Sequence, residues 1–260
     1  MAIKSVIKKS KKERLIFSTR SYPTFGRGKT FDEGNPPETV KESPYYWWFM
    51  FLRLNEDYKE TCRAKGKGKC AAIYKDFGNI YATNFKDWWN AKDSLFSEPR
   101  RGYRMSIANS QEELAPFNSE EVLNLVVPLT WSQRSLKKAF SQLVLSKVEK
   151  GKKGISVEKS EAQYKISGRW HAEAMATAYK IYTIKKESEA QGIKMTWVDI
   201  AIEAKMPMTY ALGNKSHKVE SSVRRNITIL AMRHDKRAKE FIASAATKLF
   251  PYSTQSNKKL

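Results

Sequence analysis

The chain has 260 residues, with 48 Lys and Arg against 27 Asp and Glu, a formal net charge of +21 and a pI of about 9.8. Hydrophobic residues make up 41% of it, too many for a disordered polycation. The longest uncharged runs, Ser43–Leu52 and Val122–Gln133, are shorter than the roughly 20 apolar residues of a membrane helix, so no membrane partner is expected. A folded basic protein suits a polyanion, and nucleic acid is the expected partner. The alternative is a protein whose charge serves only its solubility.

The first residues and the cysteines indicate the cellular compartment in which the protein is expected. The basic start of the chain is not followed by the apolar segment of a signal peptide. Two cysteines, Cys62 and Cys70, are too few for a disulfide framework, and their spacing matches no common zinc pattern. The sequence therefore predicts a reduced, cytoplasmic, nucleoid-associated protein without a metal or other cofactor.

Charge is uneven along the chain. Residues 151–260 carry twenty-one basic and ten acidic side chains, about half of the net charge. This asymmetry points to the last third as the place where a polyanion binds. Residues 1–42 combine early lysines with later glycines and prolines, and are expected to be a basic flexible arm that either follows phosphates or is simply solvated.

Residues 43–99 are predicted to form an aromatic helical unit. Ser43 and Pro44 fit the N-cap and first position of a helix that passes through an apolar run and ends near residues 65–69. Two further helices are expected at Cys70–Phe77 and, capped by Asn84, at Phe85–Phe96.

Four tryptophans of this unit, Trp47, Trp48, Trp88 and Trp89, are assigned to the core. The alternative is a platform on which bases stack, but large apolar side chains at helical spacing are more often buried.

Residues 120–150 are predicted to hold a strand and a helix. The strand is Leu123–Leu129, with Pro128 restricting it to a sheet edge. Thr130 or Ser132 is expected to cap a helix that continues to about Val148. A flexible basic linker follows at residues 150–154.

Residues 155–251 are predicted to be a basic helical DNA-binding domain of three helices. The first covers about 170–190, the second follows the N-cap Thr196 to Lys205, and the third runs from about Val219 to Leu249. The segment Thr196–Asn214 has the proportions of a helix-turn-helix, in which Ile200 and Ala201 would pack inward. An ordinary helical hairpin is the alternative.

The last helix is expected to carry the nucleic-acid contact, because a regular apolar stripe leaves its other faces to basic residues. A helix fits the major groove, where Arg can bind guanine and Lys can contact phosphate. The solvated face of a surface helix is the alternative. The predicted nucleic-acid-binding residues are Lys215, Lys218, Arg224, Arg225, Arg233, Lys236 and Arg237.

No arrangement typical of catalysis is found, so an enzyme is not expected and no catalytic residue is proposed. The stretch Lys65–Lys69 lacks the spacing of a phosphate-binding loop. The histidines, His171, His217 and His234, stand in no metal-binding or nuclease motif, and His234 is expected to be partly buried on the apolar stripe.

Three stretches resemble small transcriptional-regulator-like proteins of bacterial plasmids and phages. They are "SPYYWWFMFLRLNEDYKETC" at Ser43–Cys62, the continuation at Ala71–Pro99, and "RAKEFIASAATKLFP" at Arg237–Pro251. This chain has Arg53-Leu54 where the relatives have two arginines. The resemblance implies a DNA-associated regulator on a mobile element and supplies no catalytic residues.

The sequence thus predicts a mainly α protein that binds double-stranded DNA, most simply as a transcriptional regulator of a mobile element, a role with which a homodimer is compatible. Two other functions stay open. One is a phage or satellite structural or assembly protein that contacts nucleic acid or capsid, and the other is an RNA-binding protein.

Overall fold

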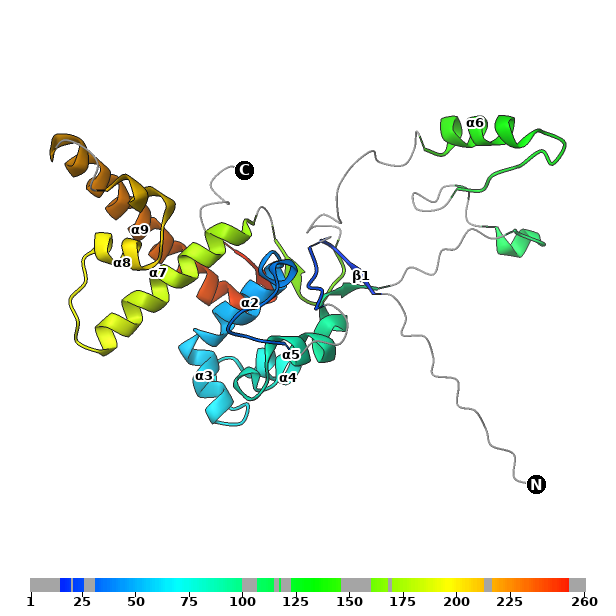
Figure 1. Cartoon of the computed structure of the whole chain (residues 1–260). Helices are drawn as coiled ribbons and strands as arrows, with labels where there is room; N and C mark the ends of the chain where they lie inside the picture. The colour runs from blue at the N-terminus through cyan, green and yellow to red at the C-terminus, as the bar shows by residue number, and fades with distance from the viewer. Residues whose placement is uncertain are drawn as a thin grey trace, which may run out of the picture. The chain divides into compact units, whose positions relative to one another are not determined.

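Side chains from both halves of the chain build one aromatic core in the computed structural model (Figure 1). The structure describes residues 15–19, 21–25, 31–99, 107–114, 117, 123–145, 160–167, 170–212 and 217–252, with Ala211 and residues 217–219 described by their backbone alone. Within these residues the fold is mainly α, as predicted. The α-helices are α1 (Glu38–Lys41), α2 (Pro44–Arg53), α3 (Glu56–Arg63), α4 (Ala71–Phe77), α5 (Phe85–Lys92), α6 (Gln133–Leu143), α7 (Ala172–Ala190), α8 (Trp197–Glu203) and α9 (His217–Ala245).

Short 3₁₀ helices and two-residue strands connect these helices. The 3₁₀ helices are Ile80–Ala82, Asp93–Phe96, Gln111–Glu113 and Pro207–Ala211, and the strands are β1 (Ile16–Phe17), β2 (Ser97–Glu98), β3 (Lys165–Ile166) and β4 (Leu249–Phe250). Strand β1 pairs antiparallel with β2, and β3 pairs parallel with β4. Each pair therefore joins segments that are far apart in the sequence.

Helix α2 is the centre of the aromatic core, and its sequence explains why. Ser43 is its N-cap and Pro44 its first residue, as predicted. Every residue from Pro44 to Phe49 is buried, as are Phe51 and Leu52, so the helix is covered on all sides. The four tryptophans assigned to the core are each at most 7% exposed, which confirms that assignment.

The predicted single helix over residues 43–65 is wrong, because the structure divides it into α2 and α3. Asn55 lies in extended conformation at the break, and its side chain accepts a hydrogen bond from the backbone N–H of Tyr58 at 2.9 Å. Its amide also donates to the Ile242 carbonyl oxygen of α9 at 3.0 Å. A helix cap and a long-range hydrogen bond thus outweigh helix continuation.

Part of the predicted arm over residues 1–42 is folded, namely the described residues 15–19, 21–25 and 31–42. Residues 1–14 lie outside the described residues. Phe17 of β1 lies against Tyr45 and Trp89, with ring centroids 6.0 and 5.5 Å away, and Phe25 and Phe31 also pack against the core. The predicted flexible arm is therefore wrong for this part, because its aromatic side chains bury apolar area that a solvated arm would expose.

Two stretches that the sequence predicts to be separate domains share the aromatic core. Trp48 stacks on Phe250 with ring centroids 5.2 Å apart, and its indole N–H donates to the Ala245 carbonyl oxygen at 2.8 Å. Tyr164, just before β3, donates to the Asp76 carboxylate at 2.7 Å. Contacts accordingly group residues 1–98 with 155–260 as one unit and leave residues 99–154 as a second unit.

The second unit contains α6 and an extended apolar segment. Ser132 caps α6, as one of the two predicted candidates, by accepting a hydrogen bond from the Ser135 backbone N–H at 3.2 Å. The predicted strand Leu123–Leu129 is wrong, because these residues form no strand. Val126 and Leu129 are 94% and 90% exposed, so none of the described residues supplies a neighbouring strand or core face for the extended run.

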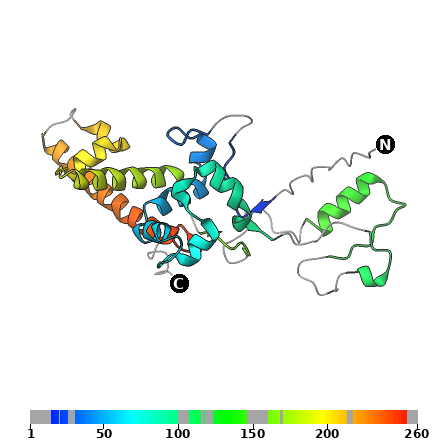
Figure 2. The same cartoon turned by 90° about the horizontal axis from the view of Figure 1, so that it is seen from below.

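Helices α7, α8 and α9 form a three-helix group, in which α7 packs across α9 (Figures 1 and 2). Ile181, Ile200 and Ile227 meet in a second apolar cluster between the three helices. Over the residues that the structure describes, none of the helices combines the length and the apolar character needed to cross a membrane.

Candidate nucleic-acid interface

Helix α9 has a buried face and a basic face, as its sequence predicts. Ile227, Ala231, Ala238 and Ala245 are fully buried against α2, α7 and α8. The remaining residues of the predicted stripe that are described, Val223, Leu230, Phe241 and Ile242, are partly buried. One side of this long helix is therefore fixed to the fold.

Four of the predicted DNA-contacting side chains lie on the opposite side of α9. Arg225, Arg233, Lys236 and Arg237 are all exposed. At about 100° per residue they fall within an arc of about 120°, and from Arg225 to Arg237 they extend about 18 Å along the helix. Among the described residues, none of the four forms an ion pair with an acidic side chain.

Arg224, the other predicted contact on α9 whose side chain is described, is different. Its guanidinium binds Glu220 one turn earlier, with Nη2 and Nε at 3.1 and 3.2 Å from the same carboxylate oxygen. This pair neutralises the charge locally, so Arg224 is less available to a phosphate. Lys215 lies outside the described residues, as does the side chain of Lys218.

A buried carboxylate joins α9 to α7. Asp235 is 5% exposed, and its Oδ2 lies 2.8 Å from the Lys239 ammonium and 3.5 Å from that of Lys185. The hydrogen bond and charge of Asp235 raise the pKa of Lys239. These two lysines therefore serve the packing of α7 on α9 and are not part of the basic face.

The segment proposed as a helix-turn-helix begins as predicted. Thr196 caps α8 in a capping box, accepting from the Asp199 backbone N–H while the Asp199 carboxylate accepts from the backbone N–H of Thr196. Ile200 and Ala201 are buried, as predicted. The element that follows α8, Pro207–Ala211, is a five-residue 3₁₀ helix and not a second α-helix. The next α-helix in the chain is the long α9.

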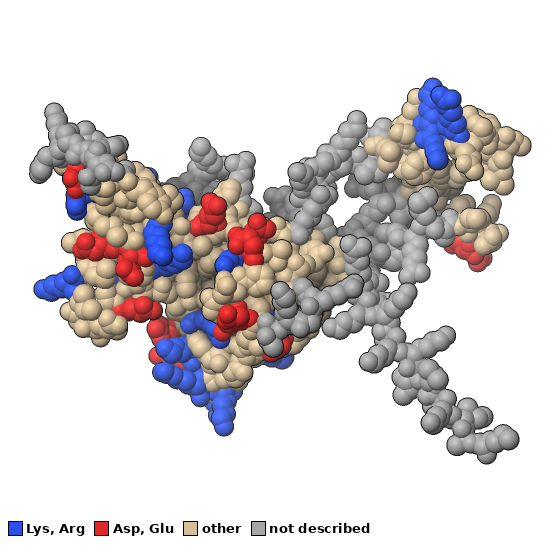
Figure 3. Space-filling view, in the orientation of Figure 1, with Lys and Arg blue, Asp and Glu red and all other residues tan. Residues whose placement is uncertain are grey.

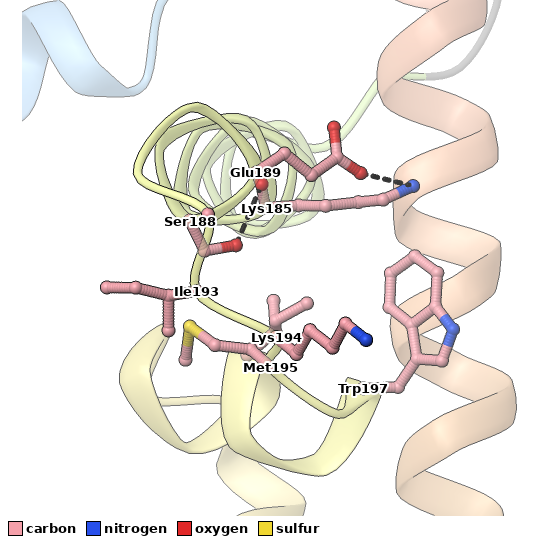
Figure 4. Close-up of a pocket in the computed structure, with 9 residues that line it drawn as sticks. Lys185, Ser188, Glu189, Ile193, Lys194, Met195 and Trp197 are labelled. Atoms are coloured by element: carbon pink, nitrogen blue, oxygen red, sulfur yellow. Dashed lines mark hydrogen bonds and ion pairs between the residues drawn. The ribbon is translucent and has the colours of Figure 1, made fainter.

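A pocket of about 440 Å³ lies where α7 turns into α8 (Figure 4). Its lining includes Trp197 and Lys185, and the Lys185 ammonium is 4.8 Å from the centroid of the Trp197 ring. Figure 4 shows this ammonium between the indole and the carboxylate of Glu189, and its Nζ lies 3.8 Å from Glu189 Oε1. Because Lys185 also faces Asp235, its charge is already balanced within the fold.

The remaining candidates for chemistry are few. His234 is partly buried, as predicted, and burial followed by the charge of Arg237 lowers its pKa. Cys62 and Cys70 are buried and form no disulfide. Within the described part of the chain, no group of three or more His, Cys, Asp or Glu side chains is placed to hold a metal ion.

A second group of cations lies outside the predicted site. Arg63, the last residue of α3, and Lys65, Lys67 and Lys69 of the loop after it are all exposed. Figure 3 shows basic side chains gathered at the lower tip of the view, in the part of the molecule where α3 lies in Figure 1. The signal in the sequence is the absence of any acid from Cys62 to Phe77 except Asp76, a feature that the spacing of a phosphate-binding motif does not capture.

No protein-family model, curated protein or solved structure matches this chain.

Proposed function

We propose that this chain is a DNA-binding protein that contacts duplex DNA through the basic face of α9. One observation carries the proposal: four exposed cations without acidic partners, among the described residues, share one side of a helix whose other side is buried in the fold. A rigid helix with such a face meets a polyanion without first losing backbone entropy.

The spacing of the four cations suits a DNA groove. The major groove of B-DNA admits an α-helix, and arginine can donate to both acceptors of guanine while lysine contacts phosphates. Between the cations, Ile229 and Met232 are 38% and 50% exposed. Apolar side chains at such positions can contact the methyl group of thymine, so the face offers both electrostatic affinity and a means of distinguishing bases.

The resemblance to regulator-like proteins of plasmids and phages supports transcriptional control as the role of this binding. In that role the protein would lie with the DNA of the nucleoid. Footprinting separates this role from packaging or assembly, because a regulator protects a defined site and a packaging protein protects none.

The interface is tested by changing Arg225, Arg233, Lys236 and Arg237 together to Gln and measuring DNA affinity against salt concentration. The slope of log K against log salt should become shallower by about 0.9 for each phosphate that the variant no longer neutralises. A single-site control is Arg224→Gln on the same helix, whose charge Glu220 already balances, and its slope should change by less than the per-phosphate value. A quadruple variant that binds like the parent would refute the interface.

A further inference from the structure

The loop Arg63–Lys69, at the end of α3, is the feature that the α9 interface does not explain. It presents four cations within seven residues and contains no acidic residue. Lys69 is balanced by Asp57, with Nζ to Oδ1 at 2.9 Å. Arg63, Lys65 and Lys67 have no acidic partner among the residues that the structure describes.

The backbone of this loop is fixed by close packing. The N–H groups of Gly66 and Lys65 donate to the carbonyl oxygens of Thr61 and Cys62, at 2.8 and 3.1 Å, and close the end of α3. A Cβ atom on Gly66 would lie 2.8 Å from the ring of Tyr74, and one on Gly68 would lie 2.5 Å from Thr61 Oγ1. The two glycines therefore let the loop lie directly on its neighbours, and the basic side chains point from a rigid base.

Lys65 occupies a position that usually favours glycine. Its φ is +52°, in the left-handed region, as is that of Lys205 after α8 at +56°, whereas the corresponding position after α7 is taken by Gly192 with φ +72°. Left-handed backbone is unfavourable for a residue that carries a Cβ atom. A cation near a helix C-terminus interacts favourably with the helix dipole, and this gain is at most of similar size, so stability alone gives lysine little advantage here.

We propose that the loop Arg63–Lys69 is a second nucleic-acid contact, specific for the phosphodiester backbone. This inference rests on the proposed DNA-binding function and adds a surface to it. The outward polar side chains of the loop are all cationic, and three of the four are lysines, which contact phosphates without reading the base sequence. Such a surface fixes the position of the duplex and contributes affinity that is independent of sequence.

The two surfaces are close enough to contact one duplex. Asn55, which begins α3, is hydrogen bonded to the Ile242 carbonyl of α9. From there, ten residues along α3 lead to Lys65 and nine residues along α9 lead to Arg233, about 15 and 14 Å of helical rise. Their separation is therefore at most about 35 Å, which is about one turn of B-DNA.

The test compares two triple variants of the full chain that remove the same charge. The loop variant changes Arg63, Lys65 and Lys67 to Gln. The matched control changes Lys180, Lys186 and Lys248 to Gln, three exposed lysines on α7 and before β4. Affinity for a DNA duplex of about 24 base pairs, and for an RNA duplex of the same sequence, is measured by fluorescence anisotropy across salt concentrations.

The salt slope on the DNA duplex should fall by about two units in the loop variant, and by less than about half a unit in the control. Equal slopes for the two variants would overturn the loop contact and leave the proposed function standing. A parent protein whose binding to DNA does not depend on salt would overturn both. A decrease confined to the RNA duplex would keep the loop as a phosphate contact and refute DNA as its ligand.

Folding of the loop variant is checked by its melting temperature, which should match that of the parent because the three side chains are exposed. If the triple variant melts early, Lys67→Gln alone replaces it, since Lys67 lies outside the left-handed position. Its salt slope should fall by about one unit, and an unchanged slope would overturn the contact.

Discussion

Replacing Trp48 by Phe tests whether one side chain joins the two halves of the core. The indole is fully buried and its N–H donates to the last carbonyl of α9, that of Ala245, at 2.8 Å. Phenylalanine leaves this buried carbonyl without its donor, at a cost of about 1–3 kcal/mol, and also leaves part of the indole volume empty. We therefore expect a decrease in stability of about 2–4 kcal/mol, and about 3–5 kcal/mol for Trp48→Ala.

The measurement is urea unfolding followed by far-UV circular dichroism, and the matched control is Trp131→Phe. Trp131 is 50% exposed and lies in the other unit, so its replacement should change stability by less than about 0.5 kcal/mol. A Trp48→Phe variant as stable as the parent would refute the role of the indole. Loss of nucleic-acid binding at unchanged stability would instead show that Trp48 stacks on bases.

Three further predictions concern the backbone, pH and the second unit. Lys205 has φ +56° after α8, so Lys205→Gly should stabilise by about 0.5–1 kcal/mol in thermal melting, whereas Lys205→Ala, which keeps a Cβ, should not. The pKa of His234 is lower in the folded state, so the unfolded chain binds more protons and stability should fall as pH drops below about 6.5. The His234→Gln variant should lose less stability over this pH range than the parent. An equal pH dependence in both proteins would contradict the role of His234. The two chain segments that flank the second unit are held together within the first unit, because Glu98 accepts hydrogen bonds from Ser160 Oγ at 2.6 Å and from the Glu161 N–H at 2.8 Å. Replacing residues 101–156 by a short Gly-Ser linker should therefore leave the melting temperature of the remaining unit unchanged. A large decrease would show that the second unit stabilises the first.

Local signals explain what the sequence could predict of the fold. The helix starts at Ser43, Asn84 and Thr196 are where they were expected, because a helix start depends only on its own turn, although the Ser43 hydroxyl makes no capping hydrogen bond. The buried tryptophans follow from helical spacing. By contrast, the apolar run at Leu123–Leu129 resembles a strand only if a partner strand exists, and local sequence does not show whether one does.

Long-range contacts explain most of what the sequence could not predict. Nothing near Trp48 in the sequence indicates that Ala245 and Phe250 complete its surroundings. For the candidate site, the outward position of the α9 cations follows from helix periodicity. The pairing of Arg224 with Glu220 also had a signal, since residues four apart on a helix face each other. The rigidity of the Lys65 loop depends on Thr61 and Tyr74 approaching its glycines, which only the folded chain shows.

The pairing of β3 with β4 and the position of Phe250 have a consequence for synthesis on the ribosome. Trp48 is translated about two hundred residues before Phe250, its stacking partner. During that interval the aromatic face of α2 stays uncovered on one side, exposed to non-native association. A nascent chain or a truncated product that stops before β4 therefore presents this face to chaperones and proteases, and quality control can act on it until Phe250 has been added.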